Sequence, residues 1–132
     1  MNFEKCLIDT TVWVLYFQGE KDIEDKVRSI ILEDKAATTE IIILEILRGA
    51  RSQKEYDQLK DDLKALHLLR LNEAIWERSH QMGFKLRKAG INVPLTDILI
   101  AAMASYYQCS LIHRDKYFPL MSKLIVLKHE RV

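Results

Sequence analysis

The sequence predicts an α/β protein with three layers, in which a central parallel sheet of four to five strands lies between two layers of helices. Short apolar runs alternate with longer segments whose apolar residues recur every three or four positions, and this alternation is typical of such sheets. The chain has 132 residues with only 4 Gly and 2 Pro, which suits one core and leaves little room for linkers. We therefore expect a single domain over residues 1–132.

Five short segments have the composition of buried strands. The first, residues 6–8, is followed directly by Asp9. The fourth, residues 110–113, has two apolar residues before His113. Strands with so little polar character are usual in parallel sheets that are covered on both faces. The expected strands span residues 6–8, 36–38, 67–71, 110–113 and 123–127.

Six segments between these strands have helical spacing or helix-boundary residues. Thr39 and Asn72 each precede a helix that their side chains can cap, Gly90 ends a helix, and the sequence Pro-Leu-Thr-Asp at 94–97 marks the start of another. Residues 10–17, rich in aromatic and β-branched side chains, fit a strand or a helix. We favour a helix, since a second strand here would need a turn that the sequence lacks. The expected helices span residues 10–17, 22–32, 40–48, 53–66, 73–89 and 98–107.

The bulk composition excludes several classes of protein. The formal net charge is +1, so any nucleic-acid site must be a local feature and not a broadly basic surface. Cys6 and Cys109 are expected to be buried thiols, and His67, His80 and His129 have no metal-ligand spacing. The N-terminus lacks the features of a signal peptide, and no apolar run is long enough to span a membrane, so we expect a cytoplasmic protein.

Two acidic residues follow expected strands. Asp9 comes directly after the first strand, and Asp115 comes just after the fourth. In an open parallel sheet, ligands bind beyond the carboxyl ends of the strands, so both side chains can belong to a site. Asp9 can equally well be the N-cap of the next helix, and Asp115 taken alone is a solvated charge in a turn.

Two further acids lie beside apolar helical segments. Glu45 stands within the otherwise apolar segment 41–47, where an unpaired carboxylate is costly unless it binds a metal, pairs with a cation or takes up a proton. The alternative is an ion pair with Arg48, three residues further on. Asp97 precedes the apolar segment 98–102, and its alternative role is an N-cap, which does not exclude metal binding.

Together the four acids indicate a site for a divalent metal. Ligands that offer only oxygen suit Mg²⁺ or Mn²⁺ and not zinc, and a divalent ion relieves the repulsion between carboxylates. Such a site supports hydrolysis at phosphorus by a metal-activated water, which leaves a 5′-phosphate and a 3′-hydroxyl. We expect Asp9 and Asp97 to bind the first ion with help from Glu45. Asp115 would reach that ion through water or bind a second one.

Four segments resemble the motifs of PIN-domain nucleases. They are residues 7–13, 44–50, 97–102 and 111–118. Their order and spacing cover essentially the whole chain, and its compact size is similar to that of the VapC toxins of bacterial and archaeal toxin–antitoxin pairs. In the fourth segment, His113 stands where many relatives have Thr or Ser, and Tyr117 stands where a further Asp is frequent.

The resemblance implies a PIN-like fold and an endoribonuclease, dependent on Mg²⁺ or Mn²⁺, that cuts single-stranded segments of structured RNA such as a tRNA or rRNA loop. It also implies the toxin component of a type II system, a cognate antitoxin protein that blocks the site, and a homodimer. Composition and spacing by themselves imply none of these.

Residues near the acids are candidates for orienting the site or binding substrate. Thr11 can orient Asp9 or contact a phosphate through its hydroxyl, or simply cap a helix. Arg48 and Arg114 can guide phosphates, although a solvated surface position is the simpler interpretation of either one. His113 can donate a hydrogen bond to an acid or a phosphate.

The helix expected at residues 10–17 carries more aromatic side chains than a small core can use. Trp13, Tyr16 and Phe17 crowd this short segment. We therefore expect part of the helix to form a groove for an antitoxin helix or a second copy of the chain.

Other functions fit less well or stay open. A phosphotransfer receiver domain would need paired acids after the first strand, and a dehalogenase-like phosphatase would need Asp-x-Asp there, but Asp9 stands alone. The alternative from another class is a catalytically inactive PIN-like module that binds proteins. Uptake of Mn²⁺ distinguishes the enzyme from the module.

Overall fold

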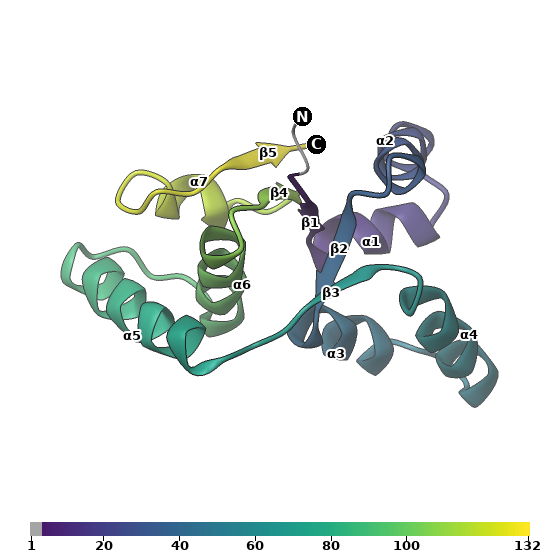
Figure 1. The fold of residues 1–132 in the computed structure, drawn as a ribbon, viewed down its shortest axis with the longest axis horizontal. Coiled ribbons are helices and arrows are strands. Elements are labelled where there is room, and N and C mark those ends of the chain that lie inside the picture. The colour runs from purple at the N-terminus through teal and green to yellow at the C-terminus, as the bar shows by residue number, and fades with distance from the viewer. Residues whose placement is uncertain (1–3) are drawn as a thin grey trace.

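The computed structural model describes residues 4–132 and contains a parallel sheet of five strands (Figure 1). The strand order is β3-β2-β1-β4-β5. The strands are β1 (Cys6–Ile8), β2 (Ala36–Thr39), β3 (His67–Leu69), β4 (Ser110–His113) and β5 (His129–Arg131). Every neighbouring pair is parallel, so all carboxyl ends lie at the same edge of the sheet. The predicted fold class is confirmed.

Helices cover both faces of this sheet. Figure 1 shows α1 to α4 on one side of the sheet and α5 and α6 on the other, with α7 packed against α6. The helices are α1 (Thr10–Phe17), α2 (Lys21–Leu32), α3 (Glu40–Arg48), α4 (Gln53–Leu63), α5 (Glu73–Lys88), α6 (Leu95–Tyr106) and α7 (Tyr117–Met121). No helix within residues 4–132 has the length and apolar character that crossing a membrane requires.

The direction in which the chain crosses the sheet changes at β1. From β1 the chain moves outward to β2 and β3, then returns through α5 and α6 to β4 on the other side of β1. Right-handed crossovers therefore place the two sets of helices on opposite faces. The crevice beyond the carboxyl ends of β1 and β4 is where open α/β sheets bind ligands. Asp9 and Asp115 follow these two strands.

The core is built around α6, which is buried on nearly all sides. Every residue from Asp97 to Ala104 is buried, and the three alanines in this stretch let the helix pack closely against β4 and α5. Leu7 of β1 and Leu111 of β4, which are paired in the sheet, are fully buried beside it. This packing places the first turn of α6, with Asp97, at the carboxyl edge of the sheet.

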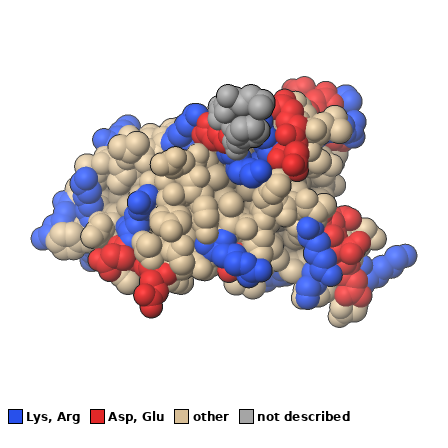
Figure 2. Space-filling model, viewed as in Figure 1, with Lys and Arg blue, Asp and Glu red and all other residues tan. Residues whose placement is uncertain are grey.

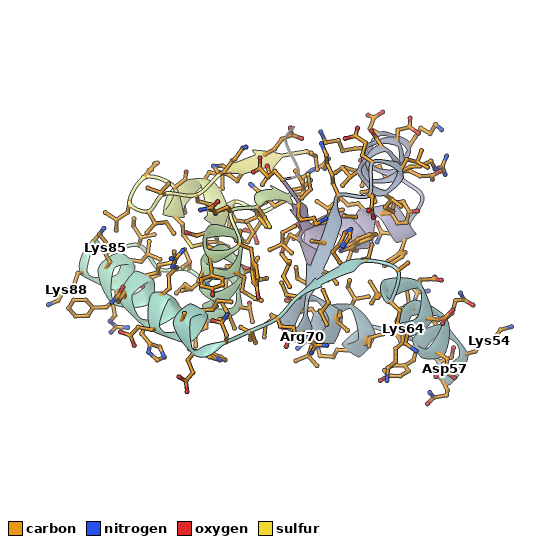
Figure 3. All side chains as sticks on the ribbon, in the orientation of Figure 1. Lys54, Asp57, Lys64, Arg70, Lys85 and Lys88 are labelled. Carbon is orange, nitrogen blue, oxygen red and sulfur yellow. The ribbon has the colours of Figure 1, made fainter. Side chains whose placement is uncertain are left out.

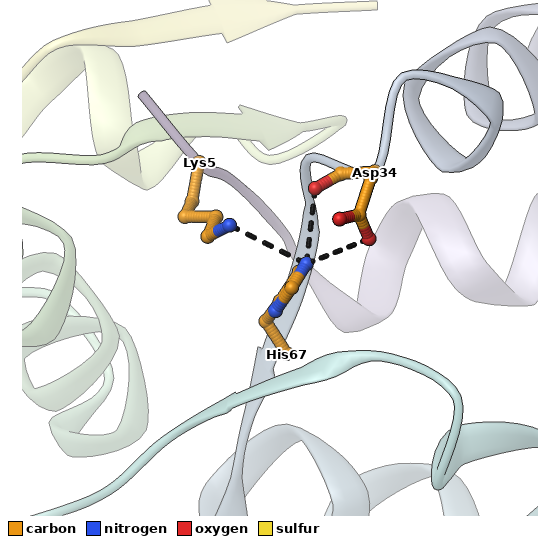
Figure 4. Close-up of polar contacts among 3 residues, drawn as sticks. All are labelled: Lys5, Asp34 and His67. Atoms are coloured by element: carbon orange, nitrogen blue, oxygen red, sulfur yellow. Dashed lines mark hydrogen bonds and ion pairs between the residues drawn. The ribbon is translucent and has the colours of Figure 1, made fainter. Parts of the chain in front are cut away.

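Polar contacts join the strands at their amino-terminal ends, on the side of the sheet opposite the carboxyl ends (Figure 4). Asp34, in the turn before β2, has a φ of 58°, a left-handed conformation that Asp tolerates. Its carboxylate lies 2.9 Å and its carbonyl oxygen 3.0 Å from His67 Nε2 at the start of β3. Lys5 Nζ lies 3.4 Å from the same nitrogen. His67 thus joins the starts of β1, β2 and β3, far from Asp9.

The last predicted strand is wrong. Residues 123–127 are irregular, the fifth strand is the polar β5, and the short helix α7 before them was not expected. Ile125 is buried while Val126 is 93% exposed, so this apolar segment covers the core without joining the sheet. The strand β5 lies at the sheet edge, where one side pairs and little is buried, and it therefore lacks the apolar signature of an inner strand.

Some element boundaries also differ from the prediction. Helix α4 ends at Leu63 and not at residue 66, and β3 ends at Leu69 and not at residue 71. Helix α6 begins at Leu95 and not at residue 98, because Pro94 is its N-cap residue. Asp97 therefore lies inside the first turn, and its predicted alternative as an N-cap is wrong.

Two predicted helix caps are confirmed. Thr39 Oγ1 accepts a hydrogen bond from Ile42 N at 3.2 Å, and Asn72 Oδ1 accepts one from Ile75 N at 2.9 Å. Each bond satisfies a backbone N–H that the helix itself leaves free.

The expectations for the cysteines and the N-terminus have different outcomes. Cys109 is buried as predicted, whereas Cys6 is half-buried, and both are free thiols. Residues 1–3, on which the predicted absence of a signal peptide partly depends, lie outside the described residues.

Candidate active site

Four acidic side chains from separate segments line one cavity of about 440 Å³. They are Asp9 after β1, Glu45 in α3, Asp97 in α6 and Asp115 after β4. They come together because β1 and β4 are neighbours and because α3 and α6 both begin at the carboxyl edge of the sheet. Thr11 and Arg114, two of the expected supporting residues, line the same cavity.

Asp9 caps α1 and also borders the cavity. Its Oδ2 accepts hydrogen bonds from Thr11 Oγ1 at 2.7 Å and from Thr11 N at 3.3 Å. The side chain is 3% exposed, and this burial raises the pKa of Asp9 to about 6. The bonds from Thr11 oppose that rise, and the nearby charges of Asp115 and Glu45 add to it. Asp9 therefore caps α1 and borders the cavity at the same time.

Asp97 is the acid with the least compensation. Its Oδ2 is buried and has no hydrogen-bond partner among residues 4–132. Burial raises the pKa of Asp97 to about 8, and the neighbouring Asp115 contributes further. At neutral pH this carboxyl holds a proton unless a cation takes its place.

Glu45 is oriented by Thr10, a residue that the sequence analysis missed. Thr10 Oγ1 donates a hydrogen bond to Glu45 Oε1 at 3.0 Å. The alternative ion pair between Glu45 and Arg48 does not occur among the described residues. Helix α3 is also less enclosed than its apolar sequence suggests, because Leu44 is 63% exposed.

Asp115 is held from two sides. Its Oδ1 accepts a hydrogen bond from Tyr117 N at 2.8 Å, where α7 begins. Its own backbone N–H donates to His113 Nδ1 at 3.1 Å. The Arg114 N–H beside it donates to Thr11 Oγ1 at 3.0 Å, which connects the ends of β4 and β1. Thr11 thus joins two of the strands that carry acids.

His113 does not play the role that the sequence suggested. It is fully buried and is not among the residues that line the acidic cavity. Its ring accepts a hydrogen bond from the backbone of Asp115, and within residues 4–132 it donates none to an acid. Its other nitrogen, Nε2, lies 2.9 Å from His129 Nδ1. Burial lowers the pKa of His113 to about 4, so the ring is neutral.

The two expected arginines differ in position. Arg114 lines the cavity, and its Nε donates a hydrogen bond to the Val132 carbonyl oxygen. Arg48 lies at the end of α3, exposed and outside the cavity lining. Only Arg114 is thus placed to meet a phosphate at the acids.

The aromatic residues of α1 divide between the core and the surface, as expected. Trp13 is 3% exposed and Phe17 is 44% exposed, while Tyr16 is half-buried. The rings of Trp13 and Phe17 stack with centroids 5.9 Å apart. Phe17 borders a second cavity, of about 430 Å³, that shares Val14, Gln18 and Glu45 with the acidic one.

The donor set fits a divalent ion such as Mg²⁺ or Mn²⁺. The four acids offer only oxygen, and the inner oxygen of Asp97 lacks a partner among residues 4–132. Over the same described range, no three Asp, Glu, His or Cys side chains are close enough to enclose an ion as they stand. Carboxylates repel one another, and Thr10 and Thr11 hold two of them in place. The side chains would therefore have to close around an ion.

Charges on the surface are mixed. On the face drawn in Figure 2, acidic and basic side chains are interspersed, in keeping with the net charge of +1. Lys85 and Lys88 lie at the outer end of α5, and Lys54 lies on α4 at the other end of the molecule (Figure 3). These lysines are too dispersed to form one basic stripe, so electrostatic binding of RNA would depend on local contacts.

Comparison with known proteins identifies the family. Residues 6–124 match the family model of the PIN domain. The chain belongs to the PIN-domain family. This PIN-domain chain is 33% identical over 127 residues to the ribonuclease VapC11 of Mycobacterium tuberculosis and to the VapC ribonuclease Mb1587 of Mycobacterium bovis. Each alignment covers 92% of this chain and 95% of the relative, so the chain is a PIN-domain ribonuclease of the VapC type.

Solved structures share the fold of this PIN-domain chain at lower sequence identity. A chain of VapBC2 from Rickettsia felis, bound to a promoter DNA fragment, has a TM-score of 0.81 at 17% identity, over 96% of this chain and 98% of that one. DNA-bound VapBC from Salmonella typhimurium gives 0.82 at 16% identity, over 97% and 98%. At these identities the similarity supports the fold alone.

Two residues that contact Glu45 or His113 in this PIN domain were missed by sequence reasoning. Thr10 follows Asp9 directly, and a hydroxyl next to an acid at a helix start is a signal that could have found it. His129 has no such signal, because only the pairing of β4 with β5 brings it to His113.

Proposed function

We propose that this VapC-type ribonuclease is an endoribonuclease dependent on Mg²⁺ or Mn²⁺, with the catalytic acids Asp9, Glu45, Asp97 and Asp115. One observation carries the proposal: acids from four segments line one cavity, and an oxygen of Asp97 is buried there without a partner among residues 4–132. Such an oxygen is costly unless a cation or a proton compensates it.

The four acids would have different roles in binding the ion. Asp9 and Asp97 would bind it with help from Glu45, while Asp115 would act through water or at a second ion. A divalent ion bound there acidifies water and neutralises charge on the phosphate. Thr11 orients Asp9 through two hydrogen bonds. Hydrolysis of this kind leaves a 5′-phosphate and a 3′-hydroxyl.

The proposed substrate is a single-stranded segment of structured RNA, such as a tRNA or rRNA loop. The relatives at 33% identity are named as ribonucleases, which supports RNA as the substrate class. An unpaired segment can place its backbone in a cavity of about 440 Å³ without a broad basic surface. Arg114, in the lining of that cavity, is the cation that would meet the phosphate.

A cognate antitoxin is the partner that we propose for the groove next to the acids, as in a type II toxin–antitoxin system. This groove is the cavity of about 430 Å³ lined by residues of α1, α3 and α4, including Phe17, Ile46 and Leu59. It shares Glu45 with the acidic cavity, so a helix lying there would reach the acids. Several chains of the same fold come from VapBC complexes, which supports this kind of partner.

A homodimer is proposed through the face formed by α5 and α6. Between these helices an apolar cavity of about 380 Å³ is lined by Trp76, Leu95 and Ile98, among others. Trp76 is 46% and Leu95 83% exposed, and clustered apolar side chains of this size mark protein contacts. A particle mass of one chain at micromolar concentration would contradict the dimer.

RNA cleavage and Mn²⁺ titration test the catalytic proposal. The parent should cleave RNA with Mg²⁺ or Mn²⁺ and stop when EDTA removes the ion. Asp9→Asn should abolish cleavage and keep the fold, because Asn can still cap α1, whereas Asp9→Ala would also remove the cap. Asp57→Asn, at an exposed position on α4, is the matched control. A parent that takes up no Mn²⁺ would favour the inactive protein-binding module.

A further inference from the structure

A series of hydrogen bonds joins β5 to the backbone of Asp115. The N–H of Asp115 lies 3.1 Å from His113 Nδ1, and His113 Nε2 lies 2.9 Å from His129 Nδ1. His129 Nε2 lies 3.3 Å from Ser122 Oγ, which donates to the Pro119 carbonyl oxygen at 2.8 Å. The proposed chemistry uses none of the side chains in this series.

Elementary donor and acceptor rules fix the direction of these bonds. A backbone N–H can only donate, so His113 Nδ1 must be the unprotonated nitrogen of a neutral ring, and its Nε2 carries the hydrogen. That hydrogen is donated to His129 Nδ1, which must then accept. His129 therefore carries its own hydrogen on Nε2, directed at the Ser122 hydroxyl.

Burial and strand pairing hold the His113 ring in this arrangement. The ring is fully buried, and its centroid lies 5.0 Å from that of Phe118 and 5.1 Å from that of His129. In the sheet, His113 is paired with Arg131, and Val132 N donates to the His113 carbonyl oxygen. The strand β5 thus fixes both the main chain and the ring of His113.

We propose that His113 and His129 are positioning residues, through which β5 sets the place of the Asp115 carboxylate and thereby the affinity of the site for its ion. The inference rests on the proposed metal-dependent function. His113 holds the backbone N–H of Asp115, and Tyr117 N holds its carboxylate. Without the contact to His113, the backbone of Asp115 would be less fixed, and so would its carboxylate. His129 keeps the His113 ring in the tautomer that this contact requires.

Mn²⁺ titration of single and double variants tests the effect on affinity. Side chains that hydrogen-bond to metal ligands typically contribute 10- to 100-fold to metal affinity, so His113→Leu should weaken Mn²⁺ binding by about 10-fold or more. His113→Asn should restore most of that loss, because the Asn side-chain oxygen can accept from the N–H two residues further on. His129→Leu should also weaken Mn²⁺ binding, and Asp57→Asn, at an exposed position on α4, should have no effect.

A double variant separates positioning from a general loss of structure. If His113 acts through Asp115, then His113→Leu should cause no further loss of Mn²⁺ affinity when Asp115→Asn is already present. An additive further loss, or wild-type affinity in His113→Leu, would overturn the inference.

Nuclear magnetic resonance tests the hydrogen bonds without metal. Both His113 and His129 should show the Nε2–H tautomer in their imidazole ¹⁵N shifts, and the Asp115 amide should lose protection from exchange in His113→Leu. An Nδ1–H tautomer for His113, or unchanged protection of that amide, would overturn the inference. A parent that binds no Mn²⁺ would instead overturn the proposed function, whereas a parent that binds it and variants that bind equally well would overturn only the positioning role.

Discussion

Burial and the neighbouring Asp115 both raise the pKa of Asp97. One of its oxygens has no hydrogen-bond partner among residues 4–132, and burial together with Asp115 raises its pKa to about 8. The carboxyl is thus unfavourable as a free anion and well suited to a cation. The fold places it there because α6 begins at Leu95, one turn earlier than the run of apolar residues suggests.

Replacing Asp97 with Asn should separate stability from function. The neutral amide removes the buried charge, so the metal-free protein should gain on the order of a few kcal/mol in free energy of unfolding at pH 8. The same variant should lose Mn²⁺ binding and RNA cleavage. Urea unfolding in EDTA measures the first effect, and Asp57→Asn should change neither property. A destabilised Asp97→Asn protein would contradict this account.

The pH dependence of the free energy of unfolding should reveal the raised pKa values of Asp97 and Asp9. The pKa of Asp97 is about 8 when folded against 3.8 ordinarily, so the folded state keeps a proton that the unfolded state has lost, and stability falls as pH rises towards 8. Asp9 acts in the same sense up to about pH 6. His113, with its pKa lowered from 6.5 to about 4, acts in the opposite sense, but only below pH 6.5.

Between pH 6.5 and 8 the effect of Asp97 should therefore be seen without that of His113. In EDTA the free energy of unfolding should decrease over this range, and Mn²⁺ affinity should increase as the competing proton leaves. Chemical unfolding and Mn²⁺ titration at several pH values measure the two trends. The absence of any decrease in Asp97→Asn is the internal control, and a flat profile in the parent would reject the raised pKa.

At the scale of elements, α1 serves both the acids and a surface groove. Its first turn carries Thr10 and Thr11, which orient Glu45 and Asp9. Its last turn presents Phe17 to the groove that we assign to the antitoxin. A ligand in the groove therefore lies within one short helix of the ion site, which is how a partner could block catalysis.

Phe17→Ala should weaken binding of the antitoxin and leave RNA cleavage unchanged. Phe17 is 44% exposed in the groove, so truncation removes partner contacts without opening the core, and an anchor residue of this kind is worth about 1–2 kcal/mol or more. Binding of the antitoxin measures the loss, and RNA cleavage by the free toxin should be unchanged. Phe84→Ala, at a 67% exposed position on α5, is the matched control. Equal losses in both variants would count against this groove.

The elements differ in how far the sequence predicts them. The helices that begin after Thr39 and Asn72 are predicted well, because local capping and apolar spacing specify them. The strand β5 and the short helix α7 are not, because β5 is a polar edge strand and the apolar residues before it cover the core from a loop. Whether a segment pairs at the edge of a sheet depends on the packing of the other strands, so the sequence of the edge strand itself carries little signal.

At the scale of the whole molecule, the bound ion should act as a stabiliser. An ion that binds only the folded state adds about 2.7 kcal/mol at a concentration of 100 times its Kd. Mn²⁺ should therefore raise the midpoint of thermal unfolding in the parent, and EDTA should lower it. Asp9→Asn should show no such shift, whereas Asp57→Asn should respond like the parent. A parent insensitive to Mn²⁺ would argue against a metal site.

The sequence by itself determined the α/β class, the order of most elements and the four candidate acids, because these depend on local periodicity, on caps and on strand ends. Only the tertiary structure decided which side chains meet. The contact of Thr10 with Glu45 and the link from Asp115 through His113 to His129 join residues far apart in the chain. Such contacts depend on crossover handedness, sheet order and strand register, and these are properties of the packed molecule that no local spacing records.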